Sequence, residues 1–289
     1  MTIKEAENHL LYEVKERVCY ITLNRPDKMN AMSWELRQDL YGLLKRAERD
    51  TEVGCIVIRG AGRTFSAGYD LSSERPSPNF PTEGYAGKQY DDMAGLYAHN
   101  LIDGWWLIWD LMKPVIAQVH GFCLAGASEL ASMCDIMFVA EDSQIGYPAV
   151  RAISTPDANY FPWKMSMNAA KYYALTGRPV SGKQAVELGW ATKSFPAEQL
   201  EESVFEEAKA LASIQPDLLA CSKRSVNRAY EVMGIRTAMN VGADWMAIST
   251  HRETEPQFGE IVQEQGLKAA LLWRDGNFGD YSAAPKNPR

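Results

Sequence analysis

Residues 120–135 read HGFCLAGASELASMCD, a turn of small residues followed by a helical pattern from Gly126 to Cys134. An apolar strand, Val115–Val119, leads directly into this turn, and another, Ile136–Val139, follows the helix. A helix that begins at such a turn has backbone N–H groups without partners inside the helix, and its dipole adds positive charge at the same end. The stretch predicts a β/α fold in which backbone donors stand at the end of a strand.

A second turn of the same design lies earlier in the chain. A short buried strand, Cys55–Ile58, runs towards the small-residue turn at residues 66–70. If donors from the two turns converge on one point, they form an oxyanion hole, in which each donor lowers a reaction barrier by about 3 kcal/mol. The alternative is that the glycines of both turns only permit tight packing of a strand on a helix.

The order of the predicted elements places the sheet in the first half of the chain. Residues 9–15 and 18–23 have the pattern of a β-hairpin, and a helix over 34–48 joins it to the strand at 55–58. A strand, a helix and a strand in succession imply a βαβ unit with parallel strands. From about Asn159 onward the pattern is nearly all helical. The helices are predicted at residues 169–175, 182–188, 198–214, 218–232 and 237–250, with one more ending near residue 266.

The composition argues against several classes of protein. With 30 basic and 37 acidic residues the formal net charge is −7, whereas a nucleic-acid-binding surface needs a basic face. No apolar run approaches the ~18 residues of a membrane span, so we expect no membrane partner. The five cysteines are scattered without a Cys-x-x-Cys pair, which predicts free thiols in a reducing cytoplasm. The four histidines have no ligand spacing, so we expect no metal site.

Several motifs point together to one family. The most specific block runs from Gly121 to Asp135 and ends Met-Cys-Asp. The other segments are residues 24–32 (NRPDKMNAM), 65–70 (FSAGYD), 114–117 (PVIA), 175–178 (LTGR), 181–189 and 266–268 (GLK). In this combination the chain resembles the crotonase superfamily, also called the enoyl-CoA hydratase/isomerase family, over essentially its full length.

The resemblance implies a fold and an assembly. The expected fold is α/β, a crotonase-like spiral of ββα units with a C-terminal α-helical trimerisation region. Residues 1–205 would form the core with the active site, and residues 206–289 a helical region that packs against the core and against neighbouring subunits. A homotrimer or homohexamer is implied. Coenzyme A enters as part of an acyl-CoA thioester substrate, and no metal or redox cofactor is implied.

The resemblance also assigns roles to residues of both turns. The backbone N–H groups of Tyr69 and Gly126 would bind the thioester carbonyl, whose oxygen gains negative charge when the α-carbon becomes enolate-like. The implied contacts with substrate or coenzyme A come from Arg25, Lys28, Ala67, Gly68, Asp70 and Tyr147. For Arg25 and Lys28 the alternative is a pair of solvated loop cations.

Two carboxylates are the predicted acid/base groups. Glu129 lies in the first turn of its helix, where its carboxylate can face the pocket; its alternative role is to complement the helix dipole. Ala149 replaces the second glutamate of the family's hydratases and cannot transfer a proton. Asp157 stands where some relatives that do not hydrate carry a catalytic aspartate, and it is equally suited to cap a helix. Arg151 is predicted to flank the same pocket.

These assignments lead to three functional hypotheses. The first is an enoyl-CoA hydratase/isomerase-like lyase that uses Glu129 and Asp157 to move protons. The second is thioester hydrolysis, a double-bond shift or carbon–carbon cleavage on the same enolate, which the alanine at position 149 favours. The third is a catalytically idle member that binds acyl-CoA or a protein. Residues 71–112 resemble the variable lid of the family, and their length and three tryptophans suggest a bulky or cyclic acyl group.

Overall fold

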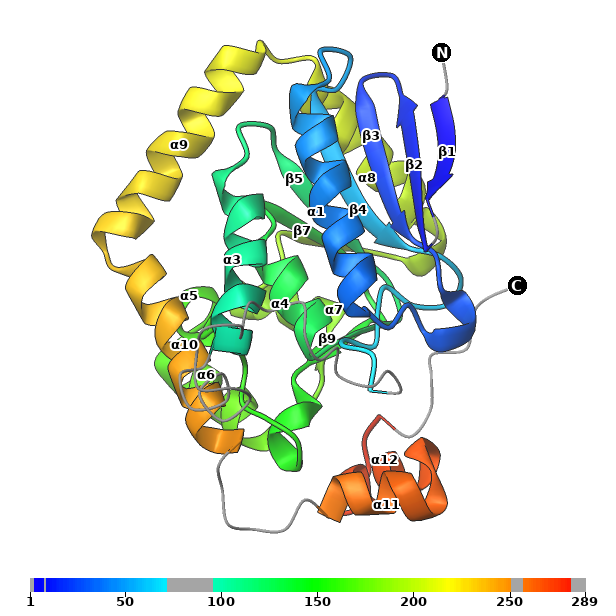
Figure 1. The fold of residues 1–289 in the computed structure, drawn as a ribbon. Coiled ribbons are helices and arrows are strands. Elements are labelled where there is room, and N and C mark those ends of the chain that lie inside the picture. Colours follow the sequence, from blue (N-terminus) through cyan, green and yellow to red (C-terminus); the bar gives the residue numbers. More distant parts are fainter. Residues whose placement is uncertain (1–2, 8, 72–95, 251–256, 282–289) are drawn as a thin grey trace, which may run out of the picture.

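The computed structural model describes residues 3–7, 9–71, 96–250 and 257–281. In these ranges the chain forms a sheet of seven strands, a smaller sheet of three strands, and helices on both sides of the larger sheet (Figure 1). Most of the predicted lid, residues 72–95, lies outside the described residues, and so does most of the loop predicted at 71–87.

The larger sheet begins antiparallel and continues parallel. Its strands, in spatial order, are β1 (Ile3–Glu7), β2 (Leu10–Lys15), β3 (Val18–Leu23), β4 (Cys55–Gly60), β5 (Val115–Val119), β7 (Ile136–Ala140) and β10 (Lys193–Phe195). The pairs β1–β2 and β2–β3 are antiparallel, and every later pair is parallel. Glu16 and Arg17 both have positive φ, as a two-residue hairpin turn requires. The predicted hairpin and βαβ unit are confirmed.

The smaller sheet contains β6 (Phe122–Leu124), β8 (Gln144–Gly146) and β9 (Val180–Ser181). The chain leaves the larger sheet for the smaller one at Gly121, which has a φ of 59°. A Cβ there would stand 2.2 Å from the carbonyl oxygen of Arg63, so no larger residue fits this crossing. The prediction of an all-helical second half was wrong at β9 and β10, because strands of two or three residues are too short to show a period.

Helices cover both faces of the larger sheet, and the sheet separates two apolar cores. On one face lie α1 (Trp34–Arg49), α3 (Leu96–Asp110) and α4 (Gly126–Met133), which together enclose the larger apolar core. On the other face α8 (Leu200–Ala212) packs Val204 and Ala208 against buried side chains of β3, β4, β5 and β7. Trp105 and Trp106 of α3 are buried in the larger core, which is the packing role expected of large aromatic side chains.

Most of the remaining helices lie towards the lower end of the molecule in Figure 1, whereas α9 (Pro216–Val232) runs along its upper left side. The others are α5 (Phe161–Lys164), α6 (Met167–Thr176), α7 (Gly182–Leu188), α10 (Ile235–Thr250), α11 (Gln257–Gln265) and α12 (Leu267–Asp275). The C-terminal hairpin, α11 with α12, packs against the short 3-10 helix η2 (Pro148–Arg151). The sequence had predicted only the first helix of this hairpin. No helix of the described residues is long and apolar enough to cross a membrane.

Candidate active site

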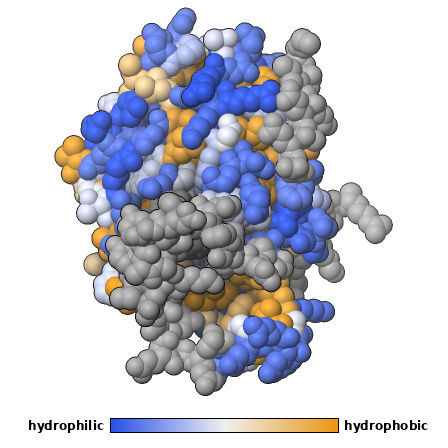
Figure 2. All heavy atoms as spheres, viewed as in Figure 1, coloured by the Kyte–Doolittle hydropathy of each residue, from blue (hydrophilic) through white to orange (hydrophobic). Residues whose placement is uncertain are grey.

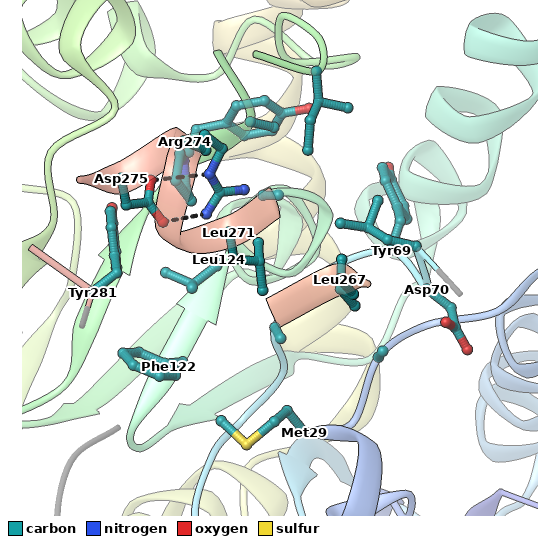
Figure 3. Close-up of a pocket in the computed structure, with 18 of the residues that line it drawn as sticks. Met29, Tyr69, Asp70, Phe122, Leu124, Leu267, Leu271, Arg274, Asp275 and Tyr281 are labelled. Carbon is teal, nitrogen blue, oxygen red and sulfur yellow. Dashed lines mark hydrogen bonds and ion pairs between the residues drawn. The ribbon is translucent and has the colours of Figure 1, made fainter. Parts of the chain in front are cut away.

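A cavity of about 440 Å³ lies between the smaller sheet, the turn after β4 and the C-terminal hairpin. Its walls are mostly apolar, and Figure 2 shows apolar residues gathered on the core side of the hairpin. Figure 3 shows Leu267 and Leu271 of α12 among the lining residues, with Tyr69 and Asp70 on one side of the view and Tyr281 on the other. An apolar hollow with a few polar groups is the usual form of a small-molecule site.

The two predicted turns meet at this cavity. Ser66 bridges to Cys123 of β6, and its carbonyl accepts a hydrogen bond of 3.1 Å from the N–H of Leu124. Gly68 has a φ of 100°, and a Cβ added there would stand 2.6 Å from the carbonyl oxygen of Leu124 and 3.4 Å from the nitrogen of Gly126. The turn after β4 therefore lies directly on the start of α4, which only glycine at position 68 allows.

Two backbone donors at this junction have no acceptor within the described ranges of the chain. Gly68 N–H donates to Ser66 Oγ at 3.1 Å, and Asp70 N–H donates to the Met32 carbonyl at 3.1 Å. Between them, Tyr69 N–H donates to no group of the described residues, and the same holds for Gly126 N–H at the first position of α4. Because nearly all buried backbone N–H groups find a partner, these two donors on neighbouring turns are candidates for binding a ligand oxygen.

Behind the turn, Tyr69 joins two buried carboxyl groups. Its hydroxyl oxygen lies 2.8 Å from Glu129 Oε2 and 2.8 Å from Asp157 Oδ2. Glu129 Oε1 accepts from the backbone N–H of Asp157 at 2.8 Å and from that of Ala158 at 3.4 Å. Glu129 is 0% exposed and Asp157 is 1% exposed. A phenol has one proton, so both contacts of Tyr69 are hydrogen bonds only when one of the carboxyl groups is protonated and donates to the phenol oxygen.

The environment of the pair favours keeping that proton. Burial raises the pKa of Glu129 well above its usual value, and the neighbouring charge of Asp157 raises it further. Burial also raises the pKa of Asp157, to about 6, against the lowering effect of Tyr69 and Arg37. The pKa of Tyr69 is raised by burial and by both carboxylates, so its phenol is neutral. Because the two carboxyl groups interact, the pKa of each depends on the protonation state of the other.

Gly126 and Arg37 both pack against the ring of Tyr69. A Cβ at Gly126 would stand 2.4 Å from Tyr69 Cζ, so the ring lies against the bare backbone at the start of α4. On this ring also lies the guanidinium of Arg37, whose carbon is 4.9 Å from the ring centre. Arg37 is itself 3% exposed, so its charge acts with little screening by water. The phenol is consequently fixed in position between the two carboxyl groups.

The predicted site residues fall into two groups. Those that line the cavity are Lys28, Ala67, Tyr69, Asp70 and Tyr147. Those that lie behind its wall are Arg25, Gly68, Gly126, Glu129 and Asp157. Neither Glu129 nor Asp157 contributes to the described lining, whereas Tyr69, whose hydroxyl contacts both carboxyl groups, does.

Both arginines predicted at the pocket have other partners. Arg25 is 8% exposed; its guanidinium is bound to Asp70 at 2.9 Å and donates to the Ala31 carbonyl at 2.6 Å. It stabilises the loop that carries Lys28, and it does not line the cavity. Arg151 is bound to Asp280 at 2.7 Å and does not line the cavity either. Both side chains were expected near the ligand from their positions in sequence motifs. A motif does not reveal which carboxylate a charged side chain pairs with.

The position of the missing glutamate faces the cavity. Ala149 lines it beside Tyr147, whose hydroxyl donates to the Thr155 carbonyl at 3.2 Å. The carboxylates in the described lining are Asp70, paired with an arginine at 2.9 Å, and Asp275, paired with Arg274 at 2.7 Å. Among the described residues, no unpaired carboxylate stands on the side of Ala149.

Sequence reasoning missed two contributions to the site. The first is the side chain of Tyr69, which was considered only for its backbone N–H. The second is the C-terminal hairpin, whose Leu267 and Leu271 line the cavity and whose end is held by Arg151 through Asp275 and Asp280. The apolar pair at a spacing of four residues was a signal for a buried helix face, whereas nothing in the sequence linked Tyr69 to carboxyl groups far along the chain.

The comparisons with known proteins agree with one another. Residues 13–259 match the family described as "Enoyl-CoA hydratase/isomerase". A probable mitochondrial enoyl-CoA hydratase of Dictyostelium discoideum is 30% identical over 263 residues, covering 89% of this chain and 86% of that protein. The hydroxycinnamoyl-CoA hydratase-lyase of Pseudomonas fluorescens is 28% identical over 227 residues, covering 76% and 78%. An enoyl-CoA hydratase/isomerase structure from Xanthobacter autotrophicus Py2 superposes with a TM-score of 0.82 at 29% identity, covering 94% of this chain and 99% of that chain.

Proposed function

The chain belongs to the enoyl-CoA hydratase/isomerase family and has its fold, and from this premise we propose that it stabilises the enolate of an acyl-coenzyme A thioester. The backbone N–H groups of Tyr69 and Gly126 bind the thioester oxygen, and the Glu129–Asp157 pair moves the proton of the α-carbon. The observation that carries the proposal is the pair of donors without acceptors in the described structure, one on each of two touching turns.

The two donors suit an enolate better than a ground-state carbonyl. A carbonyl oxygen accepts hydrogen bonds weakly, whereas an enolate oxygen carries most of a negative charge and lies near the positive end of α4. Donors fixed in a wall that excludes water need no reorganisation when that charge develops. They lower the barrier to removing the α-proton more than they strengthen substrate binding, which is the condition for catalysis.

The leading reaction is of the hydratase/isomerase type, with one proton-transfer centre. Glu129 and Asp157 share the hydroxyl of Tyr69, so they act as one unit on one side of the thioester. Adding water across a double bond with two carboxylates needs a second group near the β-carbon, and Ala149 supplies none. This favours a double-bond shift. For the same reason the second candidate is hydrolysis or carbon–carbon cleavage, in which an enolate forms but two carboxylates are not needed.

The rest of the cavity is assigned to the ligand. Lys28 lies on its rim and is exposed, so we assign it to the phosphates of coenzyme A. Ala67, Gly68, Asp70 and Tyr147 shape the wall around the thioester. The hydroxycinnamoyl-CoA relative supports an aromatic or cyclic acyl group as the first to test. Exposed apolar residues on α9 and α10, among them Val232 and Trp245, support burial of these helices in a homotrimer or homohexamer.

The test uses crotonyl-CoA, a 3-enoyl-CoA ester, a cinnamoyl-type ester and a cyclic β-ketoacyl-CoA. Each reaction is followed for the absorbance of the conjugated thioester and, in the same sample, for free thiol. Formation of a conjugated thioester from the 3-enoyl ester without thiol release is the expected result. Thiol release moves the assignment to hydrolysis. Wild-type protein that binds these esters but transforms none of them, and incorporates no deuterium from D₂O at the α-carbon, contradicts the proposal.

A further inference from the structure

Among the described residues, the phenol of Tyr69 is the only polar side-chain group that lies within hydrogen-bond distance of both Glu129 and Asp157. Tyr69 also lines the cavity, whereas Glu129 and Asp157 do not. Among the described lining residues, Tyr69 therefore connects the cavity with the carboxyl pair. Two other phenols lie near the pair: that of Tyr147 donates to the Thr155 carbonyl, and that of Tyr160 is hydrogen-bonded to Ser128.

We infer that Tyr69 is a catalytic residue. Its hydroxyl exchanges a proton directly with the α-carbon of the substrate and passes its own proton to the Glu129–Asp157 pair. This inference rests on the proposed function, because it concerns the same enolate. The backbone N–H of Tyr69 and its side chain then act on two atoms of one substrate. The N–H binds the thioester oxygen and the hydroxyl handles the proton of the neighbouring carbon.

The step balances without any further reactant. The α-carbon gives its proton to Tyr69 Oη, and the phenol proton moves to whichever carboxyl of the pair is ionised. The electron pair of the broken C–H bond becomes the carbon–carbon double bond of the enolate, and the carbonyl π electrons move onto the oxygen. When the step reverses and a proton returns to the α-carbon, the α-proton is exchanged. When the proton is delivered to the γ-carbon instead, the double bond shifts.

The surroundings of Tyr69 lower the cost of this transfer. The guanidinium of Arg37 on its ring stabilises the negative charge that develops on the phenol oxygen as the proton leaves. Both heavy-atom distances to the carboxyl groups are 2.8 Å, within the range in which general acid–base transfer occurs. Glu129 Oε1, held by two backbone N–H groups, fixes the receiving carboxyl and leaves Oε2 for the phenol.

A purely structural role for Tyr69 makes a different prediction. The ring fills the space over Gly126, and phenylalanine would fill it equally while keeping the backbone N–H. If Tyr69 only packs, Tyr69→Phe retains activity. If the hydroxyl carries the proton, the same variant binds acyl-CoA normally and loses proton transfer.

The experiment measures deuterium incorporation from D₂O at the α-carbon of butanoyl-CoA and 3-phenylpropanoyl-CoA, with the Kd of each ligand measured by calorimetry. The variants are Tyr69→Phe, Glu129→Gln and the matched control Tyr172→Phe, whose ring is half exposed on α6. For Tyr69→Phe we expect a loss of exchange of about 10²–10³-fold with an unchanged Kd. A protein with 3-fluorotyrosine introduced at position 69 alone keeps the ring and changes the acidity of the phenol. We expect its exchange rate to change and its Kd to stay the same.

The outcomes separate the inference from the function on which it rests. If Tyr69→Phe exchanges like the wild type while Glu129→Gln does not, Glu129 reaches the substrate directly, so the inference is wrong and the proposed function stands. If Tyr69→Phe weakens binding as much as exchange, or fluorination changes nothing, the role of the side chain is structural and the inference is again overturned. Wild-type protein that exchanges neither ligand contradicts the proposed function itself.

Discussion

Glu129 Oε1 accepts a hydrogen bond of 2.8 Å from the backbone N–H of Asp157, which ties the first turn of α4 to the loop before α5. The carboxyl group of Glu129 on α4 therefore positions the backbone at Asp157. Glu129 is buried beside Asp157 with both of its oxygens in use, so it does more than complement the helix dipole. The following predictions test what this arrangement does.

Removing the charge of Glu129 tests the acid/base unit. Glu129→Gln keeps the shape of the side chain and an oxygen for the N–H of Asp157, but cannot accept a proton. We expect turnover of the best acyl-CoA ester to fall by about 10²–10⁴-fold. The control is Glu264→Gln on the exposed part of α11, which we expect to behave as wild type. A Glu129→Gln protein with at least half of the wild-type kcat contradicts the assignment.

A methyl group at Gly126 tests how the phenol is positioned. Gly126→Ala places a Cβ 2.4 Å from Tyr69 Cζ, so the ring must move away from the carboxyl pair. We expect a loss of about 1–3 kcal/mol in the free energy of unfolding, as in other overpacked cores, together with loss of activity. Urea denaturation and steady-state kinetics measure the two effects. Gly259→Ala on α11, where nothing lies within 4 Å, is the control and is expected to be neutral or slightly stabilising.

The raised carboxyl pKa values predict how stability depends on pH. Because the folded state raises the pKa of Asp157 to about 6 and that of Glu129 as well, it binds more protons than the unfolded chain above about pH 4. The contribution of the pair to stability is therefore complete at low pH and is lost as the pH rises through the folded pKa values. The other ionisable groups that interact with the pair are Arg37, Tyr69, Tyr147 and Tyr160.

The measurement is the free energy of unfolding in urea at several pH values between about 4 and 8, for wild type and Asp157→Asn. The difference between the two proteins removes the effects of groups that do not interact with Asp157, and it includes the change in Glu129, whose pKa Asp157 raises. We expect the stability of the wild type to fall relative to the variant as the pH rises. A difference that is independent of pH would mean that Asp157 is ionised at every pH tested.

Arg151 is expected to hold the C-terminal hairpin in place. Its side chain is 2% exposed, lies 2.9 Å from Asp275 and 2.7 Å from Asp280, and donates to the Thr176 carbonyl. Arg151→Ala removes one partner from two partly buried carboxylates that keep Arg274 and Arg178, and the loss of such charged hydrogen bonds typically costs about 1.5–3 kcal/mol. Limited proteolysis should cut the hairpin faster, and the KM for acyl-CoA should rise more than kcat falls. Lys183→Ala, which breaks an exposed ion pair with Glu141, should change neither measurement.

The parts of the fold that the sequence predicted share a clear period or a strong turn. The hairpin at residues 9–23, the helix after Ser33 and the strand–turn–helix at 115–134 each carry such a signal, and each is present. Strands β9 and β10 carry none, because a two- or three-residue strand is specified by its neighbours and not by its own pattern. The edge strand β1 was missed because charged residues occupy part of it.

The site was predictable where one motif contained it and not where three segments meet. Tyr69 and Gly126 were recognised within their turns, and Glu129 within the first turn of its helix. The hydrogen bonds from Tyr69 to Glu129 and Asp157 span 60 and 88 residues, and no spacing rule reports contacts at that separation. The burial of Arg25 depended in the same way on Asp70, which a loop sequence does not reveal.

Position 69 contains two chemically separable groups in one residue. Its backbone N–H is present with every amino acid except proline, whereas its hydroxyl, 2.8 Å from both carboxyl groups, belongs to the tyrosine side chain. In the proposed mechanism, mutation of this single codon alters proton transfer and leaves the backbone N–H in place for the thioester oxygen. Substitutions at codon 69, in evolution or in a saturation library, can therefore change the chemistry of the side chain and keep the backbone N–H that the ligand is proposed to use.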